Sequence, residues 1–212
     1  MKKIFLIISI IIISFNSFSQ DEYINKPEGF ISTGYAPQWG LGEFENFVSY
    51  ASYRGFFFEG KKFLTSNIAV GGYLGWSGFH DLKDRGTLDF ADVKNIKADG
   101  AITGNLDNYY YNFPLMASVS YYIKPEMPIK PFITFNLGTV YQKLESYIGT
   151  AGILDETWQF QMAPEAGVFI PFGKDAEFGS HIAVRYNYIT YQKFKFNGIQ
   201  SLQLNIGISW LL

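Results

Sequence analysis

The sequence predicts an all-β protein, an eight-stranded antiparallel up-and-down β-barrel that crosses a membrane. Three observations predict it: an alternating last segment, long loops that alternate with short turns, and aromatic residues at two levels. The last segment, Gly198–Leu212, places Leu, Ile and Trp on one parity and Ser, Gln, Asn and Gly on the other. This is the period of a strand with one apolar and one polar face. The apolar row runs from Leu202 to Leu212, about the 9–11 residues that a tilted strand needs to cross a bilayer.

The composition agrees with a single membrane-embedded domain. A chain of 212 residues has the length of a single domain. Charged residues are 17% and aromatics 19%, whereas typical soluble domains have about 25% charged residues. The net charge of −2 argues against a nucleic-acid-binding protein, which needs a concentrated basic face. The absence of cysteine excludes disulfides and thiolate chemistry.

The first 19 residues are predicted to be a signal peptide, which leaves 20–212 as the barrel domain. Lys2 and Lys3 precede an apolar stretch, Ile4–Ile13, and Ser17-Phe18-Ser19 follows as a small-x-small cleavage pattern. The alternative is a membrane anchor, but the apolar stretch is shorter than the roughly 18 residues that an anchor needs. We expect the remaining chain to enter a membrane only as a closed sheet, because closure satisfies every backbone group in lipid.

Eight strand-like segments follow one another along the barrel domain. They are roughly Phe30–Ala36, Tyr53–Phe63, Ile68–Phe79, Tyr109–Ile123, Phe132–Gln142, Thr157–Phe172, Phe178–Thr190 and Gly198–Leu212, and the facing of the first two is ambiguous. Short turns lie at 65–67, 124–128 and 173–175. Longer loops are expected at Gln38–Ser52, His80–Asn108, Lys143–Glu156 and Gln192–Asn197. This alternation is typical of membrane barrels whose two termini lie on the short-turn side.

Aromatic residues fall at two levels of the predicted barrel, as expected for two membrane interfaces. Those near the long-loop end are Trp76, Tyr109, Tyr111, Tyr141, Trp158 and Tyr188. Those near the short-turn end are Tyr121, Phe132, Phe172, Phe178 and Trp210. A secreted soluble barrel, the alternative fold, has no reason to sort its aromatics in this way.

The end of the chain carries a family resemblance. Asn205, Gly207, Trp210 and Leu212 resemble the C-terminal signal of bacterial outer-membrane barrels, although that signal usually ends on an aromatic residue. Together with the leader, the strand number and the loop asymmetry, the chain from residue 20 resembles the small OmpA/OmpX-like outer-membrane barrels. The resemblance implies a monomer in the cell outer membrane that contacts outer-membrane lipids. It also implies that the barrel-assembly machinery recognises those four C-terminal residues.

A lipid A-modifying enzyme is the sharpest alternative function, and it would need a nucleophile beside a histidine base. His181 follows Ser180, so the two side chains point to opposite faces of a strand. His80 adjoins Asp81, and Ser77 has the opposite parity. We therefore expect no catalytic residues.

No cofactor or metal site is expected either. The aspartates between His80 and Asp107 lack the spacing of a calcium loop, and the glycine-rich segment 71–75 lacks the helix of a nucleotide-binding loop. Helical spacing is shown by Phe44, Phe47, Val48 and Ala51. This segment is expected to form either a short amphipathic helix or an irregular loop.

The expected function is structural or exerted through the extracellular loops, with an unknown loop ligand. An eight-stranded barrel is just filled by its own side chains, so a narrow pore is only a second alternative.

In the lumen, Glu165 and Arg185 have the inward parity of their strands. If Phe172 faces Phe178, the same register places Glu165 directly opposite Arg185, which predicts a charge-assisted pair. Alternatively, each pairs elsewhere, with Glu59 and Lys61 as further lumen charges.

Overall fold

A computed structural model describes residues 28–48, 51–89, 100–123, 128–173, 177–192 and 196–212. The expected signal peptide and the turn residues 124–127 and 174–175 lie outside these ranges. The elements are β1 (Gly29–Tyr35), β2 (Gln38–Leu41), the 3-10 helix η2 (Gly42–Asn46), β3 (Gly55–Phe63), β4 (Ile68–Asp89), β5 (Ala101–Tyr122), β6 (Lys130–Ile148), β7 (Ala151–Pro171), β8 (Phe178–Ile189) and β9 (Ile199–Leu211). Within this described part, no helix is long and apolar enough to span a membrane.

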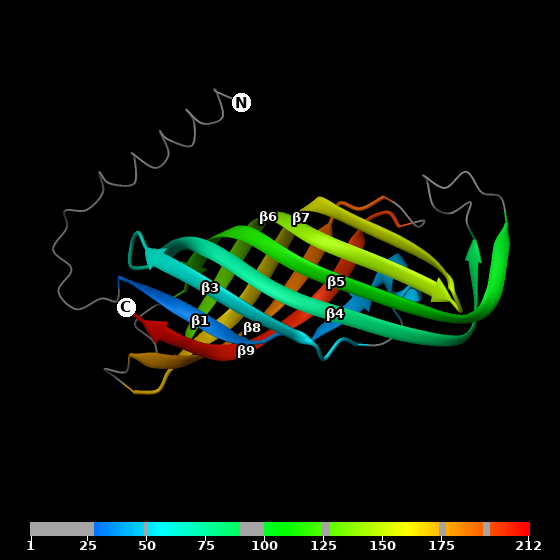
Figure 1. Ribbon diagram of the computed structural model, residues 1–212. Coiled ribbons are helices and arrows are strands. Elements are labelled where there is room, and N and C mark those ends of the chain that lie inside the picture. Colours follow the sequence, from blue (N-terminus) through cyan, green and yellow to red (C-terminus); the bar gives the residue numbers. More distant parts are fainter. Residues whose placement is uncertain (1–27, 49–50, 90–99, 124–127, 174–176, 193–195) are drawn as a thin grey trace, which may run out of the picture.

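The sheet closes into a ring, as Figure 1 shows. Each strand from β3 to β9 pairs antiparallel with the next, and β1 pairs with both β3 and β9. The short β2 also pairs with β9, so it continues β1 after an interruption at Ala36–Pro37. The ring therefore contains eight strands, and the predicted antiparallel up-and-down barrel is confirmed.

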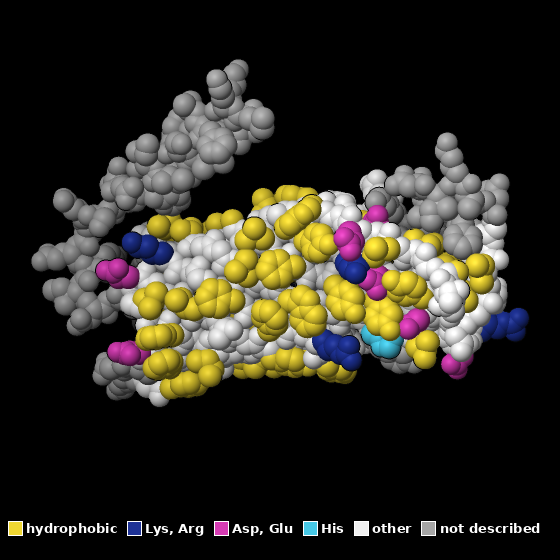
Figure 2. All heavy atoms as spheres, viewed as in Figure 1, with side chains coloured by type: hydrophobic (Ala, Val, Ile, Leu, Met, Phe, Trp, Pro, Cys, Tyr) yellow, Lys and Arg dark blue, Asp and Glu magenta, His cyan; other side chains and the backbone are white. Residues whose placement is uncertain are grey.

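Side chains alternate between the lumen and the exterior, as the sequence pattern predicted. On β5, Leu115 and Val119 are exposed while Ser118 and Ser120 are buried. The ambiguous second strand is now assigned: Phe56 and Phe58 point outward. Figure 2 shows apolar side chains along the middle of the wall, with charged side chains gathered toward the two ends.

The outward aromatics lie at two levels, with one correction. Tyr141 packs against Trp158 at 5.5 Å near the long-loop end, and Phe178 stacks on Trp210 at 5.6 Å near the short-turn end. Phe132, however, was wrongly assigned to the outer belt, because its side chain is only 2% exposed and points into the lumen. Its parity is opposite to that of Ile133 and Phe135, which face outward.

Two of the predicted long loops, His80–Asn108 and Lys143–Glu156, are largely strand, which corrects the sequence analysis. β4 and β5 remain paired to Asp89 and Ala101, and β6 and β7 remain paired to Ile148 and Ala151. Gly149, with φ of 60°, makes the second of these turns, a backbone conformation that other residues rarely adopt. The extensions carry polar residues on both faces, so they lack the alternation by which a half-buried strand is recognised.

Candidate functional site: a filled lumen below an outer sheet

The lumen centre holds the Glu165–Arg185 pair. The two residues are direct cross-strand partners of β7 and β8, and Phe172 N donates to Phe178 O, as the expected register requires. Arg185 Nε donates to Glu165 Oε2 at 2.7 Å, and Nη2 also contacts this oxygen. The guanidinium lies over the Tyr73 ring, 3.6 Å from its centroid. Because both charged side chains are buried, each depends on the other for compensation.

A second charged pair lies on β3. Glu59 and Lys61 both face the lumen, as the sequence analysis suggested, with Lys61 Nζ 2.9 Å from Glu59 Oε2. They pair with each other and not with Glu165 or Arg185. Glu59 Oε1 also lies 3.5 Å from Nδ1 of the buried His181 on β8.

Amides connect the Glu165–Arg185 pair to the rest of the lumen. Asn205 Nδ2 donates to Glu165 Oε2 at 2.9 Å, and Gln203 Nε2 donates to Tyr73 Oη at 2.9 Å. Gln203 also accepts from Gln38 Nε2 at 2.6 Å. The polar face of the last strand therefore serves as an interior hydrogen-bond network.

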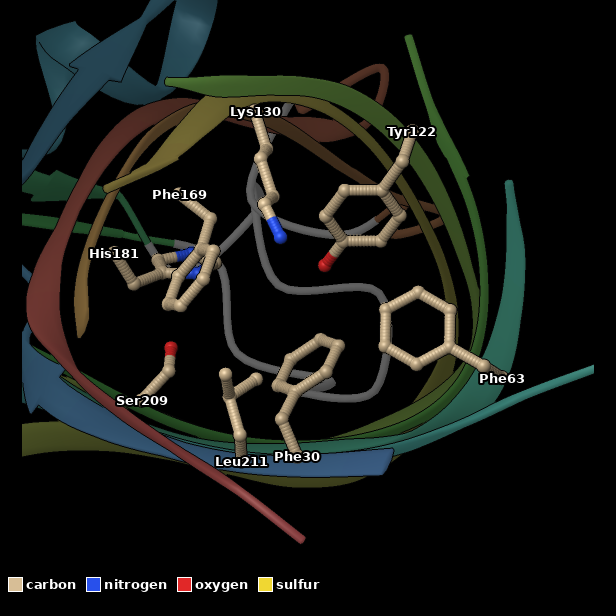
Figure 3. Close-up of a pocket in the computed structure, with 8 residues that line it drawn as sticks. All are labelled: Phe30, Phe63, Tyr122, Lys130, Phe169, His181, Ser209 and Leu211. Carbon is tan, nitrogen blue, oxygen red and sulfur yellow. The ribbon is translucent and has the colours of Figure 1, made fainter. Parts of the chain in front are cut away.

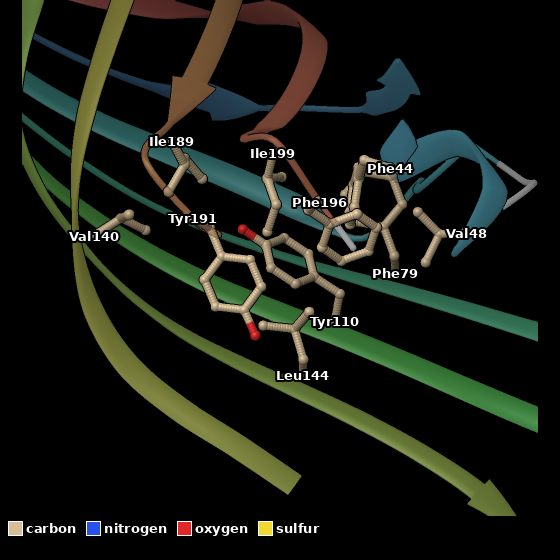
Figure 4. Packing of buried hydrophobic residues seen from close by; sticks show 10 residues of the cluster. All are labelled: Phe44, Val48, Phe79, Tyr110, Val140, Leu144, Ile189, Tyr191, Phe196 and Ile199. Atoms are coloured by element: carbon tan, nitrogen blue, oxygen red, sulfur yellow. The ribbon is translucent and has the colours of Figure 1, made fainter. Parts of the chain in front are cut away.

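An aromatic plug fills the lumen near the long-loop end, as seen in Figure 4. Its buried members are Phe44, Val48, Phe79, Tyr110, Val140, Leu144, Ile189, Tyr191, Phe196 and Ile199. Phe44, from η2, lies 4.9 Å from the Tyr110 ring and 5.4 Å from that of Phe79. The helical spacing at Phe44 and Phe47 thus gives a single 3-10 turn that is packed into the barrel mouth and does not extend to Ala51.

Above the plug, β4 to β7 continue as a four-stranded sheet of residues 79–89, 101–110, 142–148 and 151–160, which we call the outer sheet. On the β3 side the pairing of β4 ends with the hydrogen bond from Gly78 N to Arg54 O, and on the β8 side the pairing of β7 ends with that from Thr190 N to Phe160 O. Among the described residues, the outer sheet therefore has two edges without a partner strand.

His80 lies on the outside of the outer sheet, in a strand and not in a loop. Its Nε2 is 2.7 Å from Asp107 Oδ1, and Tyr109 Oη donates to Asp107 Oδ2 at 2.9 Å. Ser77 points into the lumen, where its hydroxyl bonds to Gln38 and Asn112. His181 likewise points inward, away from Ser180. Within the described residues, no cluster of three or more His, Asp or Glu side chains could hold a metal ion.

The four C-terminal signal residues occupy different environments. Asn205 is buried in the lumen, whereas Trp210 and Leu212 are exposed on the outside. Gly207 lies on the β1–β9 seam, where a Cβ would come within 2.2 Å of Thr33 O. A close backbone approach therefore requires this glycine, independently of any recognition.

Sequence reasoning missed two parts of this site. Inward parity could have placed Tyr73 under Arg185, since Tyr73 shares the polar face of its strand. The plug had no such signal, because it is assembled from separate segments that lie far apart in the sequence.

Comparisons with known proteins agree with this geometry. No family model matches the chain, and no curated protein matches its sequence. The structure superposes on Neisserial surface protein A with a TM-score of 0.53 and 12% identity, over 87% of this chain and 97% of that one. It superposes on Ail, the attachment invasion locus protein of Yersinia pestis, with a TM-score of 0.50 and 12% identity, over 89% and 100%. The chain has the fold of the small outer-membrane β-barrels. At this level of identity the similarity concerns the fold, and one outer-membrane β-barrel scaffold is compatible with many activities.

Proposed function

We propose that this protein is an integral, monomeric outer-membrane barrel, exported by a cleaved signal peptide, that acts without catalysis through its outer sheet. The open edge of β7 is the docking site for an extended segment of an external partner. The observation that carries the proposal is the four-stranded sheet that continues past the barrel with its β7 edge unpaired among the described residues. An unpaired strand edge is a template for addition of another strand.

The β7 edge is better suited to docking than the β4 edge. The outer part of β4 carries Lys83 and Arg85 and a register shift before Gly86, features by which proteins block unwanted strand pairing. Residues 151–160 of β7 contain no Lys, Arg or Pro and keep a regular register with β6.

Backbone direction identifies which amides the β7 edge offers. Phe160 O accepts from Thr190 N at 3.0 Å, so the backbone of Phe160 points toward the β8 side. Alternate residues of a strand point the same way, so Gly152, Leu154, Glu156 and Trp158 direct their N–H and C=O groups to the open edge. Leu154 and Trp158 are 54% and 58% exposed. The acidic Glu156 side chain contacts Lys143 Nζ at 3.5 Å and is still 44% exposed. The partner strand that fits carries apolar and basic side chains.

The test uses the full barrel in lipid nanodiscs and a synthetic nine-residue peptide of alternating Lys and Val. We expect the peptide to slow hydrogen exchange of the Leu154 and Glu156 amides. The matched control is the same peptide with alternate amides N-methylated, which keeps the charge and removes the backbone donors. Leu154→Pro should abolish protection without unfolding the barrel, because the lost N–H faces the open edge. Equal protection by both peptides, or by the wild type and the Pro variant, would reject docking at this edge.

A second candidate function rests on the His80–Asp107 contact. A histidine held by a carboxylate can act as a general base, and this one lies on the outer wall near Tyr109 and Tyr111, where lipid headgroups would lie. This second candidate function is the modification of lipid A, the alternative that the sequence analysis also considered. Lipid A from cells that express the wild type, His80→Ala or His181→Ala should show identical acyl chains if the protein is not such an enzyme. A chain gained or lost with the wild type and not with His80→Ala would establish the enzyme.

A further inference from the structure

A small cavity opens at the short-turn end of the barrel, far from the outer sheet. It is lined by Phe30, Phe63, Tyr122, Lys130, Phe169, His181, Ser209 and Leu211. Figure 3 shows that the polar ends of Lys130, Tyr122, His181 and Ser209 point into the same space from four different strands. The cavity, about 20 Å³, has room for a group the size of one or two water molecules.

Three of the polar groups in this cavity have unused hydrogen-bonding capacity. His181 is 1% exposed, and its Nε2 has no hydrogen-bond partner among the described residues. Within the same residues, Lys130 Nζ and Tyr122 Oη also make no hydrogen bond. Ser209 Oγ is already bonded to Ser32 Oγ at 2.6 Å. Of the three, His181 Nε2 is the atom that is fully buried without a partner, and leaving a buried polar group unpaired is costly. Lys130 is only half-buried. A polar group that enters the cavity would give His181 Nε2 the partner that it lacks.

The charges indicate that the missing group is a single anion. Lys61 and Arg185, the nearest buried cations, are neutralised by Glu59 and Glu165. Of these three cations near the cavity, only Lys130 has no carboxylate partner among the described residues. The rest of the rim is apolar, formed by Phe30, Phe63, Phe169 and Leu211. The complementary ligand is therefore a small monoanionic head attached to an apolar group.

We propose that this cavity binds a carboxylate carried on an apolar group, such as the C-terminus of a peptide with an apolar last residue or a small organic acid. Lys130 Nζ provides the charge, and Tyr122 Oη and His181 Nε2–H donate to the carboxylate oxygens. A carboxylate accepts several such donors, and a charged donor makes the strongest of these bonds. In the function proposed above the outer sheet lies outside the cell, so the short-turn end and this site face the periplasm.

His181 links the ligand to the charged pair deeper in the lumen. Its Nδ1 is 3.5 Å from Glu59 Oε1, so a ring protonated at both nitrogens would bridge the Glu59 carboxylate and the bound one. Binding then takes up a proton at His181. The charged and titratable groups around this ring are Glu59 and Lys61 on β3, Tyr122 on β5, Lys130 on β6, Glu165 on β7 and Arg185 on β8.

The experiment uses the full barrel in detergent micelles with His80→Gln, which leaves His181 as the only imidazole, since the chain has two histidines. The ring nitrogens are followed by NMR during titration with 3-phenylpropionate or the tripeptide Ala-Ala-Phe. The corresponding amides, and sodium chloride at equal ionic strength, are the controls. We expect a saturable shift toward the doubly protonated ring with either carboxylate and none with its amide. The carboxylate that binds more tightly identifies the natural source.

Two variants connect the response to the cavity. Lys130→Met should weaken binding about tenfold or more, and Tyr122→Phe about fivefold, as expected for loss of a charged and a neutral hydrogen bond. Lys62→Met removes the same charge from an exposed side chain of β3 and should change nothing. Rapid migration of the unheated variants on a detergent gel shows that they are folded. Equal shifts with acid and amide, the same shift with chloride, no saturation, or unchanged affinity in Lys130→Met would each overturn the proposal.

Discussion

At the scale of single residues, the lumen shows how far a parity argument can reach. Glu165 and Arg185 could be placed opposite each other because the turn between β7 and β8 determines the register, and both residues have the inward parity. The same argument could not find the Glu59–Lys61 contact, because these two residues lie on one strand and the orientation of long side chains decides whether they meet.

We expect the Glu165–Arg185 pair to be strongly coupled. Glu165→Gln or Arg185→Met alone strands a buried charge and should cost about 3–5 kcal/mol of unfolding free energy. The double variant should recover most of this loss, although Tyr73 loses the guanidinium over its ring; Asn205 Nδ2 can still donate to the side-chain oxygen of Gln at position 165. The unfolding free energies of the wild type, the two single variants and the double variant are measured by urea unfolding in detergent, followed by tryptophan fluorescence. Strictly additive losses would show that the two residues are not coupled.

Tyr191 should make the barrel sensitive to alkali. Its side chain is fully buried, and its hydroxyl donates to Asp155 Oδ2 at 2.8 Å. Burial, and secondly the Asp155 carboxylate, raise the pKa of the Tyr191 phenol well above its usual value. Because the folded state holds this proton more tightly, its stabilising contribution is full below about pH 10 and is lost as the pH rises beyond it.

The measurement compares the urea midpoints of the wild type and Tyr191→Phe at pH 8 and pH 11. At pH 8 the variant should be less stable by about 1 kcal/mol, since it loses one hydrogen bond. At pH 11 the difference should shrink or reverse, because only the wild type must keep Tyr191 protonated. Tyr53→Phe, at a position that is 68% exposed, is the control and should give the same difference at both pH values. A constant difference for Tyr191→Phe would contradict the prediction.

At the scale of elements, the sequence predicted the parts of each strand that face apolar surroundings on one side. Leu202–Leu212 alternates because one face meets the lumen and the other the outside, and β9 has nearly these bounds. Residues 80–89 and 101–108 also form strands, but polar side chains on both faces give them the composition of a loop. The plug could not be predicted because its contacts depend on the closure of the whole ring.

The seam between β1 and β9 should tolerate no side chain at its glycines. A Cβ at Gly34 would lie 2.4 Å from Gly207 Cα, and one at Gly207 would lie 2.9 Å from Gly34 Cα. Gly207→Ala or Gly34→Ala must therefore separate the strands that close the barrel, at a cost of about 1–3 kcal/mol. Gly60→Ala is the matched control, because a Cβ there meets nothing within 4 Å. The folded fraction of each variant is read from the unheated band on a detergent gel, and equal fractions for Gly34→Ala and Gly60→Ala would refute the argument.

At the scale of the whole molecule, three layers occupy the lumen in series. The carboxylate cavity lies at the short-turn end, the two charged pairs lie in the middle, and the aromatic plug lies below the outer sheet. The outer wall is apolar between its two aromatic levels. The wall thus faces lipid and the interior is packed, so only the two ends of the barrel are accessible. We assign the external partner to the outer sheet and the carboxylate ligand to the short-turn end.

The packed interior predicts that the protein forms no stable ion channel. Arg185, Tyr73 and Glu59 fill the middle layer with side chains that are at most 2% exposed, as expected for a ring of this size. In planar lipid bilayers we expect no steady openings from the wild type. Phe44→Ala removes a central ring of the plug but leaves the middle layer intact, so it too should stay closed. The variant that should begin to conduct is Glu165→Ala combined with Arg185→Ala and Phe44→Ala, because it removes side-chain volume from two layers at once. Steady openings from the wild type, or from Phe44→Ala alone, would show that the middle layer does not seal the lumen.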